Sequence, residues 1–560
     1  MALLRQATTF CLVALTLALV VPIAASAREC SSYTSCAKRA LVSVDTHAPP
    51  PAGFRLAARE VIRISDRTQA VRAELRLGHG LRAAVYTRGP GEWQVSYFRR
   101  GREVARTHIA DATGRVLDAR RGSLPAGRMQ FYGYDVPWRH RLFLLMAALT
   151  FAFLLGVLRF RRPFTLHHVD LLALVGFMVP LAAMTIGHPA VAVALVYPFL
   201  AYLFVRLMWL GIGRARIRPE WVNPRSDRWL LIGLLVAFAL RVLFNVTSSF
   251  VTDEGYGGVV GANSIHHGWP LYNEDSNHLD VYGPIVYLAY LPFELVFPMD
   301  ANWTRDSLPA AHAAAIGFDL LTLVALYIVG RRLATSHRVG LTLAFAWATY
   351  PFTLFVLAEN DNDALVGLLV ILALLALAAP VVRGALIGLA AGTKFAPLAL
   401  TPLFATGAGP PRRRKGLGAI AAATGVAVLA VFAYLPDGGV REFVDTTIVA
   451  AQRSNSPFSI WSLFEPVAVL RVPSLLGLVL LAALLIVWPT RRAPIQVAAL
   501  AAAVLIGIQI TSRHWLYPYT LWFAPLALVA FLVPTRAPSM PGRIENRVHN
   551  ERAGTLSSQR

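Results

Sequence analysis

Residues 229–250 have the sequence WLLIGLLVAFALRVLFNVTSSF, and Val251-Thr252-Asp253-Glu254 follow directly. Arg241 is the only charged residue in this apolar run. As a helix, the run is long enough to cross a hydrocarbon core of about 30 Å. It therefore predicts a membrane span that ends next to two adjacent carboxylates.

Ten further apolar runs predict, with 229–250, eleven spans in all: 141–159, 169–187, 190–212, 310–330, 339–357, 364–380, 417–435, 467–488, 495–512 and 517–533. Two other segments are ambiguous. Residues 284–298 are short and punctuated by proline, which suits an interfacial or re-entrant piece. Residues 384–404 are broken at Lys394-Phe395-Ala396-Pro397.

The composition excludes other classes of protein. Of 560 residues, 56% are hydrophobic and 15% are charged, and the mean hydropathy is +0.53. Soluble proteins have roughly 45–50% apolar and about 25% charged residues. This composition excludes a soluble enzyme and a disordered chain. We expect an all-α polytopic membrane protein with a small α+β domain at its N-terminal end.

The net charge of +22 comes largely from short basic clusters between the apolar runs. Such clusters are typical of cytoplasmic loops rather than of nucleic-acid binding. All of them lie inside if 284–298 does not cross the membrane and 384–404 enters and returns, or pairs with another short half-span. The clusters are Arg159/Arg161/Arg162, Arg214/Arg216/Arg218 with Arg225/Arg228, Arg331/Arg332/Arg338, Arg412/Arg413/Arg414/Lys415 and Arg491/Arg492. The basic tail 534–560 is also expected in the cytoplasm.

Residues 1–27 have the pattern of a secretory signal, with Arg5, an apolar run and then Ala25-Ser26-Ala27. An uncleaved anchor is the alternative, and both interpretations place residues 28–138 outside the cytoplasm. Cys30 and Cys36 form a close pair in that oxidising compartment, where a disulfide is expected.

Residues 28–138 are expected to form a small exported domain, with a helix at 66–76 and strands at 92–98, 103–109 and 115–119. Part of it resembles the PepSY-like domain. The residues that carry this likeness are Trp93-Gln94-Val95 and Asp111-Ala112-Thr113-Gly114-Arg115-Val116. No nucleophile–base pair or metal cluster stands out in this stretch, which favours a regulatory or binding module.

The loop 251–283 contains no Lys or Arg but many glycines, prolines and aromatic residues. Asp253 stands where the preceding span leaves the bilayer, and a low-dielectric setting would raise its pKa and its strength as a base. An ordinary solvated loop start is the alternative interpretation.

The order of short motifs from 229 to 533 resembles the GT-C superfamily of integral-membrane glycosyltransferases. The closest branch is the polyprenol-phosphate-mannose-dependent mannosyltransferases of glycosyltransferase family 87. The motifs are Asp253 with Glu254, Gly268-Trp269-Pro270-Leu271-Tyr272 (one inserted residue against the family pattern), Tyr282-Gly283-Pro284-Ile285-Val286-Tyr287, Asn360-Asp361-Asn362-Asp363-Ala364-Leu365 and Gly388-Leu389-Ala390-Ala391-Gly392-Thr393-Lys394. Residues 139–228 hold three additional spans, whose role stays open.

The resemblance implies a plasma-membrane enzyme that works on the outer face. It would move a sugar, most plausibly mannose, from a polyprenyl-phosphate-linked donor to a lipid or glycan acceptor by an inverting single displacement. The departing phosphate needs no proton, so one general base is sufficient. The resemblance places that base at Asp253, with Glu254 or Asp280 as alternatives. No cofactor and no metal are expected.

Positive side chains are expected to stabilise the departing phosphate. The candidates are Arg453, Arg513, His514 and Lys394, although Arg453 and Arg513 could simply snorkel at the membrane edge. For the acceptor, the candidates are His266, Tyr282 and Trp461, with a solvated loop histidine as the alternative for His266. The intramembrane charges Arg241 and Asp319 are expected to pair as a structural tie.

Two other functions stay open. A transporter or lipid flippase would also have many spans and buried charges, but no convincing internal repeat is visible. A membrane sensor with the PepSY-like domain as its input would need a cytoplasmic output domain, and only the tail 534–560 is available for one.

Overall fold

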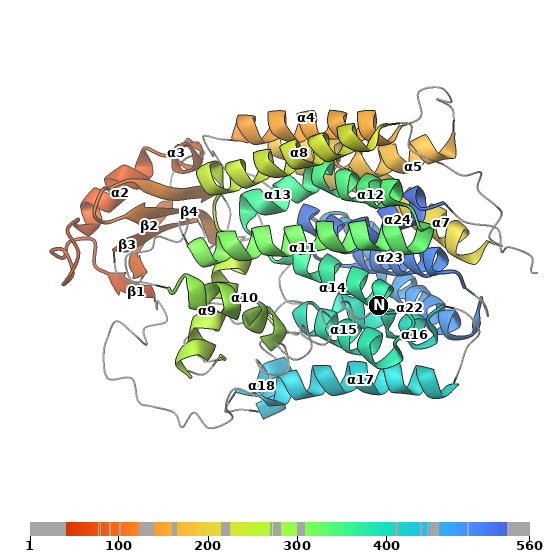
Figure 1. Cartoon of the computed structure of the whole chain (residues 1–560). Coiled ribbons are helices and arrows are strands. Elements are labelled where there is room, and N and C mark those ends of the chain that lie inside the picture. The colour runs from red at the N-terminus through yellow and green to blue at the C-terminus, as the bar shows by residue number, and fades with distance from the viewer. Residues whose placement is uncertain are drawn as a thin grey trace, which may run out of the picture.

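The computed structural model describes residues 41–76, 78, 80–88, 91–99, 102–121, 139–158, 165–213, 225–268, 271–272, 282–299, 308–408, 413–436, 439–444, 447, 458–489 and 492–534. A small domain that contains a sheet lies at one end of a large bundle of helices (Figure 1). The expected signal segment 1–27, the cysteine pair Cys30 and Cys36, and the tail after residue 534 lie outside the described residues.

The small domain is a five-stranded antiparallel sheet whose strands follow one another in chain order. The strands are β1 (Leu41–Val44), β2 (Leu81–Arg88), β3 (Glu92–Arg99), β4 (Arg102–Ala110) and β5 (Val116–Arg121). Alternate residues of β3, namely Trp93, Val95 and Tyr97, are buried with Val61 of α2 and Val71 of α3 in one core. The helices are α2 (Ala58–Asp66) and α3 (Gln69–Leu75).

The sequence predicted three of these strands, and the structure confirms them as β3, β4 and β5. The prediction of one helix at 66–76 was wrong, because the chain breaks between α2 and α3. Thr68 causes the break: it is extended, and its side chain accepts a hydrogen bond from the backbone N of Val71 at 3.4 Å, which starts α3.

Asp111, the first residue of the stretch that resembles the PepSY-like pattern, is a structural clamp. Its carboxylate accepts hydrogen bonds from the backbone N of Arg55 at 2.7 Å, from that of Leu56 at 2.9 Å, and from Trp93 Nε1 at 2.8 Å. These bonds tie the segment before α2 to the sheet and leave the carboxylate little freedom for chemistry.

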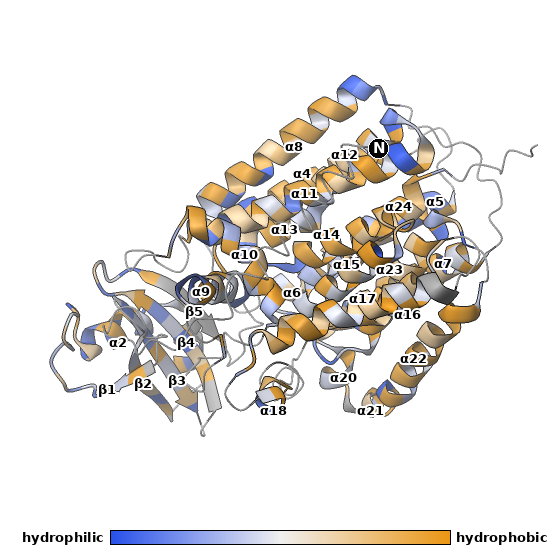
Figure 2. Cartoon of the chain, turned by 60° about the horizontal axis from the view of Figure 1, so that its bottom comes forward, coloured by the Kyte–Doolittle hydropathy of each residue, from blue (hydrophilic) through white to orange (hydrophobic). Residues whose placement is uncertain are grey.

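Seven helical segments among the described residues are long and apolar enough to span a membrane, and their apolar character is visible in Figure 2. They are α4 (Arg139–Val157), α5 with α6 (Leu166–Val175 and Met178–Thr185), α7 (Pro189–Ile212), α8 (Asp227–Ser248), α11 (Pro309–Ala334), α21 with α22 (Glu465–Ala468 and Arg471–Val487) and α23 (Pro494–Thr511). The chain is an integral, polytopic membrane protein.

The other four predicted spans are shorter or broken. The run 339–357 forms α12 (His337–Thr349) and α13 (Pro351–Glu359), which meet at 51°. Tyr350 between them is extended, as expected before a proline. The remaining three runs form shorter apolar helices: α14 (Asp363–Leu375), α17 (Arg413–Phe432) and α24 (Thr520–Leu532).

Both ambiguous segments are short helices. Residues 284–298 form α10 (Pro284–Val296), whose 13 residues give a length of about 20 Å, less than a full crossing. Residues 384–404 contain most of α15 (Pro380–Thr393), then η3 (Ala396–Leu400) and α16 (Thr401–Thr406), which returns beside α15 and α17. This is the entering and returning arrangement that the basic clusters require. The other short helices are α9 (Asp253–His267), α18 (Gly439–Val444), α20 (Ile460–Leu463) and η5 (Tyr517–Tyr519).

The three additional spans are part of the same helical body. The longest of them, α7, packs along α23, and α4 packs against α12 and α13. A Cβ atom on Gly156 of α4 would lie 2.0 Å from the ring of Phe345 in α12, so the two helices touch closely. Residues 139–228 therefore stabilise the bundle instead of hanging from it as a separate module.

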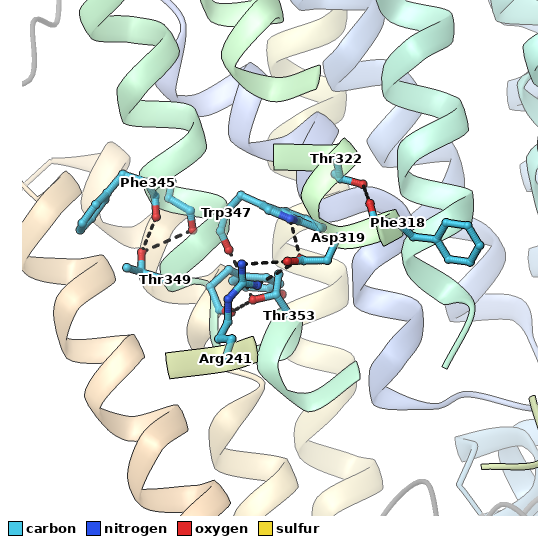
Figure 3. A network of polar contacts seen from close by, with 10 residues as sticks. Arg241, Phe318, Asp319, Thr322, Phe345, Trp347, Thr349 and Thr353 are labelled. Atoms are coloured by element: carbon cyan, nitrogen blue, oxygen red, sulfur yellow. Dashed lines mark hydrogen bonds and ion pairs between the residues drawn. The ribbon is translucent and has the colours of Figure 1, made fainter. Parts of the chain in front are cut away.

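Arg241 of α8 and Asp319 of α11 form the predicted tie inside the bundle (Figure 3). Both side chains are buried, and their atoms meet in two contacts, Nη1 with Oδ1 at 3.0 Å and Nη2 with Oδ2 at 2.9 Å. Trp347 Nε1 donates a further hydrogen bond to Asp319 Oδ1 at 2.9 Å. The pair joins three helices, α8, α11 and α12, away from the candidate site.

Candidate active site

The start of α9 and the loop between α13 and α14 are joined by backbone hydrogen bonds. Phe250 N donates to Ala358 O at 3.0 Å, and Thr252 N donates to Glu359 O at 2.9 Å. Two chain segments more than a hundred residues apart are thereby held in register. Because the carboxylates follow immediately in both segments, this pairing brings them together.

Asn360 completes the joint. Its φ of 52° is in the left-handed region, where asparagine is among the better tolerated residues. Its Nδ2 donates to Ser249 Oγ at 2.9 Å and to Phe250 O at 2.8 Å, and its Oδ1 accepts from Asn245 Nδ2 at 2.7 Å. A Cβ atom on Gly255 would lie 2.1 Å from Asn360 O, so the first turn of α9 fits against this loop only with glycine at that position.

Four charged side chains gather here: Glu254, Asp361, Asp363 and Lys394, which we call the Lys394 cluster. Lys394 Nζ lies 2.9 Å from Glu254 Oε1 and 3.1 Å from Asp363 Oδ1. Trp522 Nε1 donates to Asp363 Oδ1 at 2.5 Å. The three carboxylate residues are buried, with exposures of 5%, 0% and 0% in chain order. The break after α15 thus delivers a lysine to the only charged partners that can compensate its burial in the described part of the chain.

Two tyrosines flank the ammonium group. The rings of Tyr282 and Tyr519 have their centroids 5.5 and 5.6 Å from Lys394 Nζ, within the range of cation–π attraction. Tyr282 is positioned by the backbone, because Tyr272 OH donates to its carbonyl at 2.8 Å. The lysine is therefore held from two sides by aromatic rings and from two others by carboxylates.

Burial and mutual repulsion raise the pKa values of two carboxyl groups in the Lys394 cluster. Burial raises the pKa of Glu254, while the charge of Lys394 opposes that rise. Burial raises the pKa of Asp361 well above its usual range, and the charges of Asp363 and Glu254 raise it further. With three carboxylates and one ammonium, the cluster favours either a proton on Asp361 or a second cation.

The same carboxylates have the geometry of a metal site. One ligand oxygen from each of Glu254, Asp361 and Asp363 lies within 4.8 Å of the others. Among the described residues, Glu254 Oε2, Asp361 Oδ2 and Asp363 Oδ2 have no hydrogen-bond partner. Oxygen ligands of this kind suit Mg²⁺ or Ca²⁺. The expectation that no metal is needed stays a prediction, since the residues present would fit one.

Asp253 and His514 lie at the edge of the Lys394 cluster. Asp253 is the first residue of α9 and is half-buried. Burial lowers the pKa of His514 to about 4, the charge of Lys394 lowers it further, and the charge of Asp253 acts in the opposite direction. His514 is therefore neutral near pH 7, and it would contact a phosphate through a hydrogen bond and not through charge. Its Nδ1 has no partner among the described residues.

The other predicted site residues lie elsewhere. Trp461 Nε1 donates to Ile510 O at 2.7 Å, and Ser462 Oγ donates to the carbonyl of the exposed Arg513 at 3.4 Å, which places α20 at the end of α23. His266, in the last turn of α9, pairs through Nδ1 with the buried Glu294 Oε2 at 2.8 Å. Asp280 and Arg453 lie outside the described residues.

The sequence did not single out Asp361, Asp363, Tyr519 and Trp522 as site residues. A signal for two of them was present, because Asn360-Asp361-Asn362-Asp363 interrupts two strongly apolar runs. Charged residues at such a position are expensive unless they have a purpose. Nothing in the sequence indicated the two aromatic residues.

Comparison with known proteins bears on the later part of the bundle. No curated protein and no solved structure matches the chain. Residues 281–512 contain Asp361, Asp363 and Lys394 but begin after Asp253 and Glu254. These residues, 281–512, match the model of glycosyltransferase family 87, which supports a membrane glycosyltransferase of that family.

Proposed function

We propose that the chain transfers a sugar from a polyprenyl-phosphate donor to a lipid or glycan acceptor outside the cytoplasm, by an inverting single displacement. Mannose is the proposed sugar. The small N-terminal domain and the site lie on the outer face of the plasma membrane in this proposal. Their placement at the same end of the helical bundle supports it (Figure 1).

One observation carries the assignment of the base. Of the acidic residues that the structure brings together, Glu254, Asp361 and Asp363 are buried, whereas Asp253 is half-buried and outside the ion pairs of Lys394. A general base must reach the proton of the acceptor hydroxyl within about 3 Å. Asp253 is the carboxylate that an acceptor can approach.

The Lys394 cluster has a supporting role in this proposal. Lys394 is already paired with two carboxylates, so its charge holds Glu254 beside the base and is not free for a phosphate. The departing phosphate would be stabilised by the exposed Arg513, by Arg453 and by a hydrogen bond to His514. Accumulation of the charged groups at one end of the bundle favours transfer over transport, which needs a site near the midplane.

The experiment is a transfer assay with a radiolabelled polyprenyl-phosphate sugar and a panel of acceptors. Asp253→Asn keeps the size of the side chain but cannot accept the proton, and loss of a general base typically lowers the rate on the order of 10²–10⁴-fold. Glu442→Gln, an amide substitution in α18 of another loop, is the matched control and should transfer normally.

Donor binding is measured beside turnover, at equal amounts of protein. Normal turnover by Asp253→Asn would refute the assignment of the base. Donor that crosses a vesicle membrane without forming a new glycosidic bond would show that the chain is a transporter.

A further inference from the structure

The two helices of the small domain carry five exposed arginines: Arg59, Arg63, Arg67, Arg72 and Arg76, which we call the arginine stripe. The first three are four residues apart, so they lie along one side of α2 and its C-cap. A four-residue step advances about 6 Å along a helix. The stripe is therefore a row of positive charges at regular intervals on the protein surface.

The acidic side chains of these helices do not neutralise the stripe, because each has another partner. Glu60 accepts from the backbone N of Ala57 at 3.2 Å, and Asp66 accepts from Tyr97 OH at 2.7 Å. Glu74 pairs with Arg99 at 2.8 Å. Within the described residues, no carboxylate lies within the 4.0 Å of an ion pair from any of the five arginines.

The whole domain has the same sign. Residues 41–121 contain 15 arginines and no lysine against eight aspartates and glutamates, an excess of seven positive charges. A surface of one sign attracts polymers of the opposite sign and raises their local concentration. The partner expected from charge complementarity is thus a polyanion.

A bilayer is disfavoured as that polyanion. A helix that lies in a membrane surface inserts its apolar side between the lipids. The apolar side of α2 is already used, because Ala58 and Val61 are fully buried in the domain core and Ile62 and Ile64 pack against it. In Figures 1 and 2, α2 also lies on the side of the sheet away from α9 and the membrane helices.

We propose that the arginine stripe binds an anionic glycan polymer that carries carboxylate or phosphate groups along its length. The planar guanidinium group matches both of these anions with two parallel hydrogen bonds. An extended polymer can place successive anions along the row. The choice of a glycan rests on the proposed function, which places this domain outside the cytoplasm, but binding needs no contact with the Asp253 site.

The test measures binding by the full-length protein in nanodiscs of zwitterionic lipid. The probes are polygalacturonate as the anionic glycan, dextran as a neutral glycan, and phosphatidylglycerol vesicles as the anionic membrane. Arg59→Gln/Arg63→Gln removes two charges of the stripe. Arg82→Gln/Arg115→Gln removes two exposed charges elsewhere in the same domain and is the matched control.

We expect polygalacturonate to bind and dextran not to bind. Two exposed ion pairs are together worth on the order of 1–2 kcal/mol, so the stripe variant should bind about tenfold more weakly. The control should change less than about twofold.

Equal weakening in both variants would show an effect of net charge alone and overturn the proposal. Binding to the vesicles but not to polygalacturonate would assign the stripe to membranes and also overturn it. Sugar transfer is measured separately, so failure of the binding proposal is distinguishable from failure of the proposed reaction.

Discussion

Substitution of Gly255 by alanine tests whether the joint between α9 and the loop at Asn360 positions the site. The new Cβ atom would lie 2.1 Å from Asn360 O, whereas ordinary contact begins at 3.4 Å. The two segments must therefore separate by about 1.3 Å, the difference between these distances. A misplacement of about 1 Å at a catalytic site can lower the rate on the order of 10²-fold.

The measurement is the rate of sugar transfer per amount of folded protein, together with thermal unfolding in detergent. Overpacking of this kind typically costs about 1–3 kcal/mol of stability, so Gly255→Ala should remain folded but unfold at a lower temperature. Gly477→Ala is the matched control, because a Cβ atom there would have no atom within 4 Å. If Gly255→Ala transfers sugar within twofold of the original chain, the joint does not position the base.

Three further predictions concern buried charges. Lys394→Met should lower stability by about 3–5 kcal/mol, because two carboxylates lose their partner, and adding Asp363→Asn should recover part of this loss in thermal unfolding. Arg241→Leu should cost a similar amount, and the double variant with Asp319→Leu should unfold near the original temperature. His514→Gln should make the unfolding temperature less sensitive to acid. The pKa of His514 is about 4 when folded and near 6.5 when unfolded, so its contribution to stability is lost as the pH falls from 6.5 towards 4.

The positions of the membrane helices follow from the sequence because the bilayer leaves few options. A backbone in lipid must satisfy its own hydrogen bonds, so a long apolar run becomes a helix almost regardless of its neighbours. The bend at Tyr350 is different, because the run 339–357 is continuous in hydropathy and only the proline after Tyr350 indicates a break. The division between α2 and α3 likewise depends on a single capping side chain, Thr68.

The site was predicted only in part because its residues meet through tertiary contacts. The position of Lys394 in apolar sequence indicated a purpose, and the structure gives that residue two carboxylate partners. The partners could not be named in advance, since Glu254 and Asp363 belong to segments 109 residues apart in the numbering and are brought together by the backbone joint at Phe250 and Thr252. Hydropathy describes each segment alone and contains no information about such a joint.

The adjacent pair Asp253 and Glu254 shows what the structure adds to the choice of a base. In sequence the two residues are equivalent, because both follow the same span and both are acidic. In the first turn of α9 they point about 100° apart, since a helix has 3.6 residues per turn. One side of that turn faces Lys394, so Glu254 is buried and paired, while Asp253 stays at the edge. A carboxylate that is paired with an ammonium 2.9 Å away is a weaker base than one outside an ion pair, because the opposite charge stabilises its ionised form. The burial that makes Glu254 conspicuous is thus the reason to assign the proton transfer to its neighbour.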